Sequence, residues 1–289
     1  MLLVCAAVFL ASCKEQKADL RFVPGKSANY EMVFDIASGG LNNGRKTDYK
    51  QGATLLLQMT EDSGRTNVNA TYKRFWANFH TIGDSMKVDT DKPQTWDLKN
   101  DAQAMPAIYQ AVKDESFSFR INTLGKIEAM PPFTPMLTSI TRKVLPAEHA
   151  DNIKAYSQIY DIASGFFSPG SMKMLLVPVF QEFPGKELKV GDTLGRNYQI
   201  EDGLPITIVQ VVKVAEITDE AVTLLIGGSG FSSASIESDL KLEQQGRLTV
   251  NRKTGVMQLA YIENIVKGKL GDVDLDSRMI INATCKKLP

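Results

Sequence analysis

Histidine is the side chain that most often acts as the base in hydrolytic triads, and this chain carries only two histidines. His80 lies in the stretch NFHTIGD beside an expected loop, and His149 lies in AEHADN near an expected helix start. The stretch closest to a Gly-x-Ser-x-Gly nucleophile elbow, GGSGFSSAS, lacks the closing glycine. We therefore predict structural or surface roles for both histidines, interpret the serine-rich stretch as a flexible loop, and expect no enzymatic activity.

Acidic residues at alternate positions could hold a metal ion. Asp272, Asp274 and Asp276 alternate as in calcium-binding loops, but the sixth-position glycine and the distal glutamate of an EF-hand are missing. We interpret the stretch as a solvated strand connection and expect neither a metal nor a cofactor. A carboxylate-dependent hydrolase, with two acids facing each other across a cleft, is a less favoured alternative. Trp76 and Trp96 could stack on a sugar ring, but packing is the commoner use of such residues.

Methionines gather in the middle of the chain, close to several phenylalanines. They are Met105, Met130, Met136, Met172 and Met174, with Phe133, Phe166, Phe167 and Phe180 nearby. Soft, adaptable side chains of this kind suit a cavity that accepts varied apolar ligands. They suit an ordinary hydrophobic core as well, and the core is the favoured interpretation.

A cysteine ends the apolar run LLVCAAVFLASC at residues 2–13, which is too short to span a bilayer as a helix. Leu10, Ala11, Ser12 and Cys13 resemble the lipobox of bacterial lipoproteins. The resemblance implies that residues 1–12 are a signal peptide, with Leu10, Ala11 and Ser12 recognised by the signal peptidase. It also implies that the Cys13 thiol carries a diacylglycerol and becomes the first residue of the mature protein.

The residue after the cysteine is Lys14. In Gram-negative lipoproteins an aspartate at this place favours retention in the inner membrane. The resemblance therefore implies an outer-membrane location, on the periplasmic side or at the cell surface, with the membrane contacted through the lipid on Cys13.

Composition is that of an ordinary globular protein, with 43% apolar and 23% charged residues. The 33 basic residues are balanced by 33 acidic residues, whereas a nucleic-acid binder would carry a basic excess. We expect a tether over residues 13–27 and a single domain over 28–289. Cys285 is the one cysteine within that domain, and the alternation in MIINATCKK predicts a buried position for it.

Apolar residues alternate with polar ones at both ends of the domain, which predicts antiparallel strands with one face exposed to water. The first meander covers about residues 28–97 and includes NYEMVFDI, ATLLLQMT and TNVNATYKRFW. The second covers 188–287 and includes PITIVQVVKVAEI, EAVTLLIGG and LDSRMIINATCKK.

Between the meanders, apolar residues recur at three and four, which predicts amphipathic helices interrupted by the hairpin ESFSFRINTLGKIEAM. In SPGSMKMLLVPVFQEF, Ser168 is the expected N-cap and Pro169 the first-turn proline. Pro178 should kink or shorten this last helix.

The stretches FSFRINTLGKIEAM, FPGKELKVGDTL and QQGRLTVNRKTGVM are similar to an uncharacterised family of bacterial lipoproteins common in Bacteroidota. That family has no established activity, so the resemblance implies an architecture and a location only. The order of meander, helices and meander also resembles that of periplasmic lipoprotein carriers, which is a likeness of architecture alone.

We thus expect an α+β fold, in which two β meanders form a curved sheet and a helical middle segment packs on its concave side. The expected function is a non-enzymatic, lipid-anchored envelope lipoprotein that binds or carries a hydrophobic or amphipathic ligand. Such a protein should enclose an apolar cavity of several hundred Å³. The alternative is a structural or interaction module that docks envelope proteins or glycans through an exposed apolar patch, without a cavity.

Overall fold

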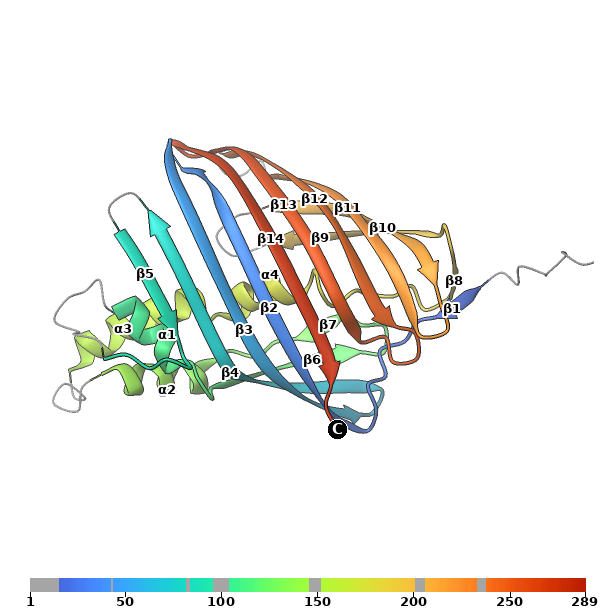
Figure 1. Cartoon of the computed structure of the whole chain (residues 1–289), viewed down its shortest axis with the longest axis horizontal. Coiled ribbons are helices and arrows are strands. Elements are labelled where there is room, and N and C mark those ends of the chain that lie inside the picture. Colours follow the sequence, from blue (N-terminus) through green and yellow to red (C-terminus); the bar gives the residue numbers. More distant parts are fainter. Residues whose placement is uncertain are drawn as a thin grey trace, which may run out of the picture.

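The computed structural model describes residues 16–42, 44–81, 84–95, 104–145, 152–200, 206–232 and 238–289. Long strands stand side by side in one curved antiparallel sheet, and the helices lie on one side of that sheet (Figure 1).

The N-terminal strands are β1 (Lys17–Asp19), β2 (Ser27–Asn42), β3 (Arg45–Asp62), β4 (Arg65–Thr81) and β5 (Asp84–Asp89). The middle of the chain forms α1 (Ala104–Ala111), β6 (Ser116–Asn122), β7 (Ile127–Ala129), α2 (Thr134–Val144), α3 (Ile153–Phe166) and α4 (Pro169–Leu176). The C-terminal strands are β8 (Glu187–Lys189), β9 (Thr193–Ile200), β10 (Ile206–Ile217), β11 (Ala221–Ser232), β12 (Ser238–Asn251), β13 (Met257–Leu270) and β14 (Val273–Lys287).

Twelve of the described strands belong to the large sheet, in the order β7-β6-β4-β3-β2-β14-β13-β12-β11-β10-β9, with β5 also paired to β4. The first and last long strands, β2 and β14, pair at its centre, where Phe34 lies opposite Ala283 and Ile36 opposite Ile281. This pairing joins the N-terminal and C-terminal strands into one sheet. β1 and β8 form a separate two-stranded sheet.

The predicted α+β class with a helical middle segment is wrong, because the chain is mostly β. Among the described residues only four helices occur, of 8 to 14 residues, and β6 and β7 of the middle segment join the large sheet. The strands are also much longer than their apolar stretches. In β3 the apolar alternation begins at Ala53, whereas the strand begins at Arg45. In residues 45–50 only positions 47 and 49 are half-buried and the others are exposed. Tyr49 is the one large apolar side chain among them, so this part of the strand shows no two-residue apolar period.

Part of the predicted tether over residues 13–27 is packed into the fold. In β1 Ala18 lies opposite Leu188 of β8. Ala18, Leu20 and Phe22 are at most 3% exposed, and the backbone N–H of Phe22 donates to the carbonyl oxygen of Thr123 at 2.8 Å. The folded part of the chain therefore begins about ten residues earlier than predicted.

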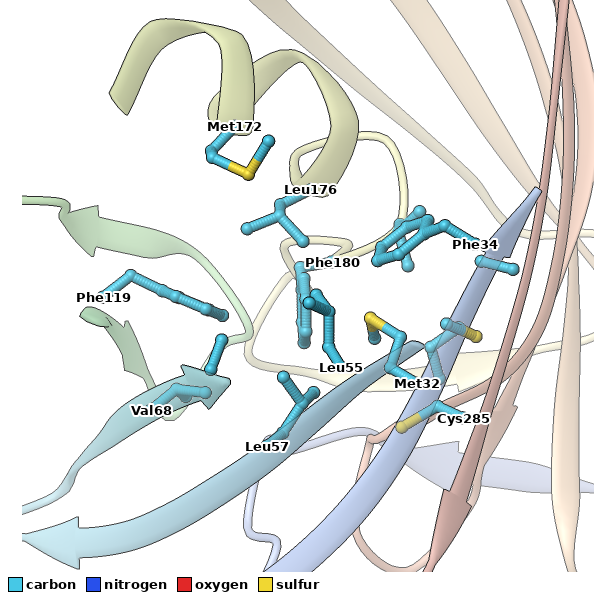
Figure 2. Packing of buried hydrophobic residues seen from close by; sticks show 14 of the residues in the cluster. Met32, Phe34, Leu55, Leu57, Val68, Phe119, Met172, Leu176, Phe180 and Cys285 are labelled. Carbon is cyan, nitrogen blue, oxygen red and sulfur yellow. The ribbon is translucent and has the colours of Figure 1, made fainter. Parts of the chain in front are cut away.

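The main core lies between the inner face of the sheet and the helices α1–α4. Figure 2 shows Leu176 of α4 and Phe180, just beyond this helix, pointing toward Leu55 and Leu57 of β3. Leu57 has no exposed surface. Burial of such side chains is the main favourable contribution to folding, at about 25 cal/mol per Å² of apolar surface.

A row of buried polar side chains crosses the inner face of the C-terminal strands. Gln210 Nε2 donates to Gln244 Oε1 at 2.6 Å, and Gln244 Nε2 donates to Asn264 Oδ1 at 2.9 Å. Arg196 Nε donates to Gln210 Oε1 at 2.5 Å. This row separates the main core from a second apolar cluster, formed by Ile206, Ile208, Leu240, Leu242 and Val266.

Candidate functional site

A cavity of about 530 Å³ lies between the inner face of strands β2–β5 and the helices α1, α3 and α4. Small-molecule pockets typically measure ~300–1,000 Å³ and are lined mainly by hydrophobic and aromatic side chains. The lining of this cavity is of that kind, and the described residues that line it include no Asp, Glu, Lys, Arg or His.

Small residues open the space on the sheet side of the cavity, at Ala53 and Ser38, and on the helix side, at Gly165. Ala53 of β3 lies in register between two phenylalanines, Phe34 of β2 and Phe75 of β4. Ser38 of β2 and Gly165 of α3 also line the cavity. Ala53 carries only a methyl group and Gly165 only a hydrogen where a larger side chain would fit, so the space between the neighbouring rings stays unfilled.

Aromatic rings form much of the wall. The ring centroid of Tyr109 in α1 lies 4.9 Å from that of Phe75 and 5.3 Å from that of Phe166. The ring of Tyr72 in β4 meets that of Phe167 edge-on, at 6.0 Å between centroids. Tilted and edge-on ring pairs of this kind are favourable. They fix α1 and the end of α3 against β4.

Helix α4 closes the cavity opposite the sheet. Ser168 is its N-cap, with Oγ accepting from the Ser171 backbone N–H at 3.1 Å, and Pro169 is its first residue, so the predicted start is confirmed. The helix ends two residues before Pro178, which cannot continue it because a proline ring collides with the preceding turn. Met172 lines the cavity from this helix, and its Sδ accepts from the Tyr72 hydroxyl at 3.4 Å.

Three polar side chains of the lining, Tyr49, Gln51 and Tyr109, form a cluster. Of the other polar lining side chains, Ser38 lies opposite Tyr49 in register, whereas the hydroxyls of Tyr72 and Ser171 are hydrogen-bonded elsewhere. The Tyr49 hydroxyl donates to Gln51 Oε1, and Tyr109 of α1 lines the cavity beside Tyr49. Burial raises the pKa of Tyr49 to about 12, and burial together with the neighbouring Tyr49 raises the pKa of Tyr109 further. A catalytic nucleophile or base would need the opposite shift at neutral pH. The cluster can therefore accept and donate hydrogen bonds but is not activated for proton abstraction.

His80 and Trp76 lie on β4, away from the cavity. The side chain of Phe79 lines the cavity, whereas that of His80, one residue on, is exposed on the opposite face, across from Asp48. This agrees with the predicted surface role. Trp76 is half-buried beside Gly52, where an added Cβ would lie 2.3 Å from the indole Nε1. Trp76 thus packs on the sheet, the commoner role expected for it.

The alternating acids near the C-terminus form ion pairs across a hairpin. Asp274 Oδ1 lies 3.7 Å from Lys269 Nζ, and Asp276 Oδ2 lies 3.9 Å from Lys267 Nζ. In the part of the chain that the structure covers, no three acidic, histidine or cysteine residues are grouped as metal ligands. These contacts agree with the interpretation as a solvated strand connection.

Cys285 is buried and unpaired, as predicted, with 7% of its surface exposed. Desolvation raises the pKa of its thiol to about 12, so the thiol stays protonated at neutral pH and contributes to packing and not to nucleophilic chemistry.

The stretch GGSGFSSAS, predicted to be a loop, continues β11 as far as Ser232, and its last three residues lie outside the described residues. An added Cβ at Gly230 would lie 2.7 Å from Ile206 Cγ2, so close packing between strands explains this glycine.

The clustered methionines divide between core and cavity. Met136 is buried in the core and Met130 packs against it, whereas Met105 and Met172 line the cavity. Of the phenylalanines near them, Phe166 and Phe167 line the cavity as well. The side chain of Met174 lies outside the described residues.

Several predicted residues lie outside the described part of the chain. They are the proposed peptidase-recognition residues Leu10, Ala11 and Ser12, the proposed lipid-attachment residue Cys13, and also His149 and Trp96.

Three lining residues were not predicted from the sequence, namely Ser38, Tyr49 and Gln51. They lie in the mainly polar halves of β2 and β3. A signal was present, because Tyr49 and Gln51 continue the two-residue alternation of Ala53 and Leu55 toward the N-terminus.

No helix within the described ranges is both long and apolar enough to cross a lipid bilayer. A sequence model of the family described as "Family of unknown function (DUF6263)" matches residues 63–257. Because this match covers more than half of the chain, the chain belongs to that family. An uncharacterised family was expected, and the description assigns no activity. No curated protein matches the sequence.

Three solved structures illustrate what the backbone is similar to. The β domain of the Bordetella autotransporter Brka is 6% identical, with a TM-score of 0.34, over 90% of this chain and 99% of that one. An outer-membrane channel from Pseudomonas putida F1 is 9% identical, with a TM-score of 0.25, over 91% of this chain and 96% of that one. OpdQ from Pseudomonas aeruginosa is 8% identical, with a TM-score of 0.27, over 92% of this chain and 100% of that one. Similarities this low carry no functional argument.

Proposed function

We propose that this member of the family is a lipid-anchored protein of the bacterial outer membrane that binds a hydrophobic or amphipathic small molecule without transforming it. The cavity of about 530 Å³ carries the binding part of this proposal. It has the size and the apolar lining of a ligand pocket, and small residues such as Ala53 maintain its volume.

The anchor in this proposal is a diacylglycerol on Cys13, supported by the lipobox-like residues Leu10, Ala11 and Ser12. Three residues lie between Cys13 and the start of β1 at Lys17, and the four extended steps that join them span at most about 14 Å. The lipid would therefore hold the β1 and β8 end of the domain close to the membrane surface.

The character of the lining supports binding over catalysis. Burial raises the pKa of both cavity tyrosines, Tyr49 and Tyr109, and no acidic side chain lines the cavity within the described residues. A hydrolase with two carboxylates is therefore not supported at this site. A module that docks envelope proteins or glycans is less well supported than a ligand binder, because it has no need of a cavity.

Filling the cavity should abolish binding. In the full-length chain carrying Cys13→Ser, the uncharged fluorescent probe diphenylhexatriene should bind saturably. The substitution Ala53→Phe places a third ring between Phe34 and Phe75, and we expect it to weaken probe binding by at least about tenfold. Fluorescence titration of the two proteins measures the effect.

The matched control is Ala37→Phe on β2. Ala37 follows the cavity residue Ile36 and does not line the cavity, so this substitution should leave the titration unchanged. If the ring at position 53 prevents folding, Gly165→Leu replaces it, because an added Cβ at Gly165 meets no atom within 4 Å. Equal probe binding by wild-type, Ala53→Phe and Gly165→Leu proteins would contradict the proposal.

A further inference from the structure

The cavity combines a large apolar wall with one small polar cluster, which is formed by Tyr49, Gln51 and Tyr109. All three side chains line the cavity, from β3 and from α1 on the facing side. An apolar pocket with few, localised polar groups fixes the orientation of its ligand through those groups. The cluster therefore marks the place where a ligand's polar end would be bound.

The amide of Gln51 supplies donors that are not used within the cluster. The carbonyl oxygen of the Gln51 amide accepts from the Tyr49 hydroxyl, and Tyr109 of α1 lies beside Tyr49. The Gln51 amide nitrogen carries two N–H groups, and no described residue accepts from it. These N–H groups can donate to a ligand.

The described lining residues carry no charged side chain, and this restricts the ligand further. No lysine or arginine is present among the described lining residues to pair with an anionic headgroup, and no aspartate or glutamate is present to pair with a cation. Burying an unpaired charge in such surroundings costs far more than burying a neutral polar group that is hydrogen-bonded.

From this arrangement we infer that the ligand is an uncharged amphipathic molecule, whose apolar part fills the cavity and whose head presents an accepting oxygen, as in an ester, to the Gln51 amide N–H groups. The inference rests on the proposed function and specifies the ligand class of the same cavity. It distinguishes an ester-like lipid from fatty acids, phospholipids and cationic amphiphiles.

Competitors that share a twelve-carbon chain and differ in their head group test the inference. Each is titrated against diphenylhexatriene bound to the full-length chain carrying Cys13→Ser, in which the cavity is unaltered, and displacement of the probe is measured. Methyl dodecanoate should bind about tenfold more tightly than dodecane, which corresponds to one hydrogen bond at the cluster. Dodecanoate at pH 9 and dodecyltrimethylammonium should bind more weakly than the ester by on the order of a hundredfold.

The substitution Gln51→Leu should lower the ratio of the affinity for methyl dodecanoate to the affinity for dodecane by about tenfold. Gln58→Leu is the matched control. Gln58 lies on the same strand, is exposed, and accepts from Asn69 Nδ2 at 3.3 Å, so its replacement should alter neither affinity.

The outcomes separate the inference from the proposed function. Equal affinity for ester, alkane and ionic competitors, with no effect of Gln51→Leu, would overturn the inference while leaving the cavity a binding site. Failure of every competitor and of the probe to bind would overturn both. Tighter binding of dodecanoate than of the ester would overturn the inference alone.

Discussion

Replacing Leu57 by alanine will lower the free energy of unfolding by about 2–5 kcal/mol, the range found for leucine-to-alanine substitutions in protein cores. Leu57 has no exposed surface and lies on β3 in the main core, where Figure 2 places it below Leu55 and Phe180. Its truncation removes apolar contacts and leaves a void between the sheet and α4. Urea unfolding followed by circular dichroism measures the change.

The matched control for Leu57→Ala is Leu225→Ala on β11. Leu225 is 44% exposed, and a surface substitution of this kind should alter stability by no more than about 0.5 kcal/mol. If Leu57→Ala lowered the free energy of unfolding by no more than Leu225→Ala, the conclusion that Leu57 packs in a core between the sheet and α4 would be wrong.

Replacing Gln244 by leucine will lower the free energy of unfolding by about 1–3 kcal/mol for each buried polar group that loses its partner. Gln244 is 4% exposed and stands at the centre of the polar row, bonded to Gln210, Asn264 and Tyr198. Its removal orphans an amide N–H of Gln210 and the side-chain oxygen of Asn264. Urea unfolding of Gln244→Leu measures the loss of stability.

Two comparisons make this second result specific. Gln258→Leu, at an exposed position of β13, should change stability by no more than about 0.5 kcal/mol. The triple substitution Gln210→Leu, Gln244→Leu and Asn264→Leu should lower the free energy of unfolding by less than the sum of the three single losses, since it removes three amides that are partners of one another and leaves only Arg196 and Tyr198 without theirs. Full additivity of the three losses would contradict the network.

Sequence periodicity located the strands but not their lengths. Alternation was clear only where one face of a strand is buried, as from Ala53 to Met59 in β3. The halves that carry mainly polar side chains on both faces have no apolar period, so the sequence predicts strands that are too short and, for the same reason, too large a share of helix in the fold. The start of the fold was missed for a related reason. Ala18, Leu20 and Phe22 alternate with Lys17, Asp19 and Arg21, but the stretch is short and its charges suggested a tether.

The sequence predicts that an apolar cavity exists, but it does not predict where in the fold the cavity lies. The pattern of apolar helices beside an apolar sheet face pointed to a pocket, and Met105 and Met172 do line it. Its position depends on register, which sets Ala53 between Phe34 and Phe75 and brings Tyr49 near Tyr109 of α1. No local pattern encodes these pairings between segments that are distant along the chain.

Native mass spectrometry is the most direct test of ligand binding in the cavity. The full-length chain carrying Cys13→Ser would be purified gently from a host envelope, alongside the same chain with Ala53→Phe. We expect a co-purifying, lipid-sized mass on the first protein, removable by organic extraction and absent from the second. A bare chain mass for both proteins, even after incubation with a lipid extract of that envelope, would contradict the proposed function.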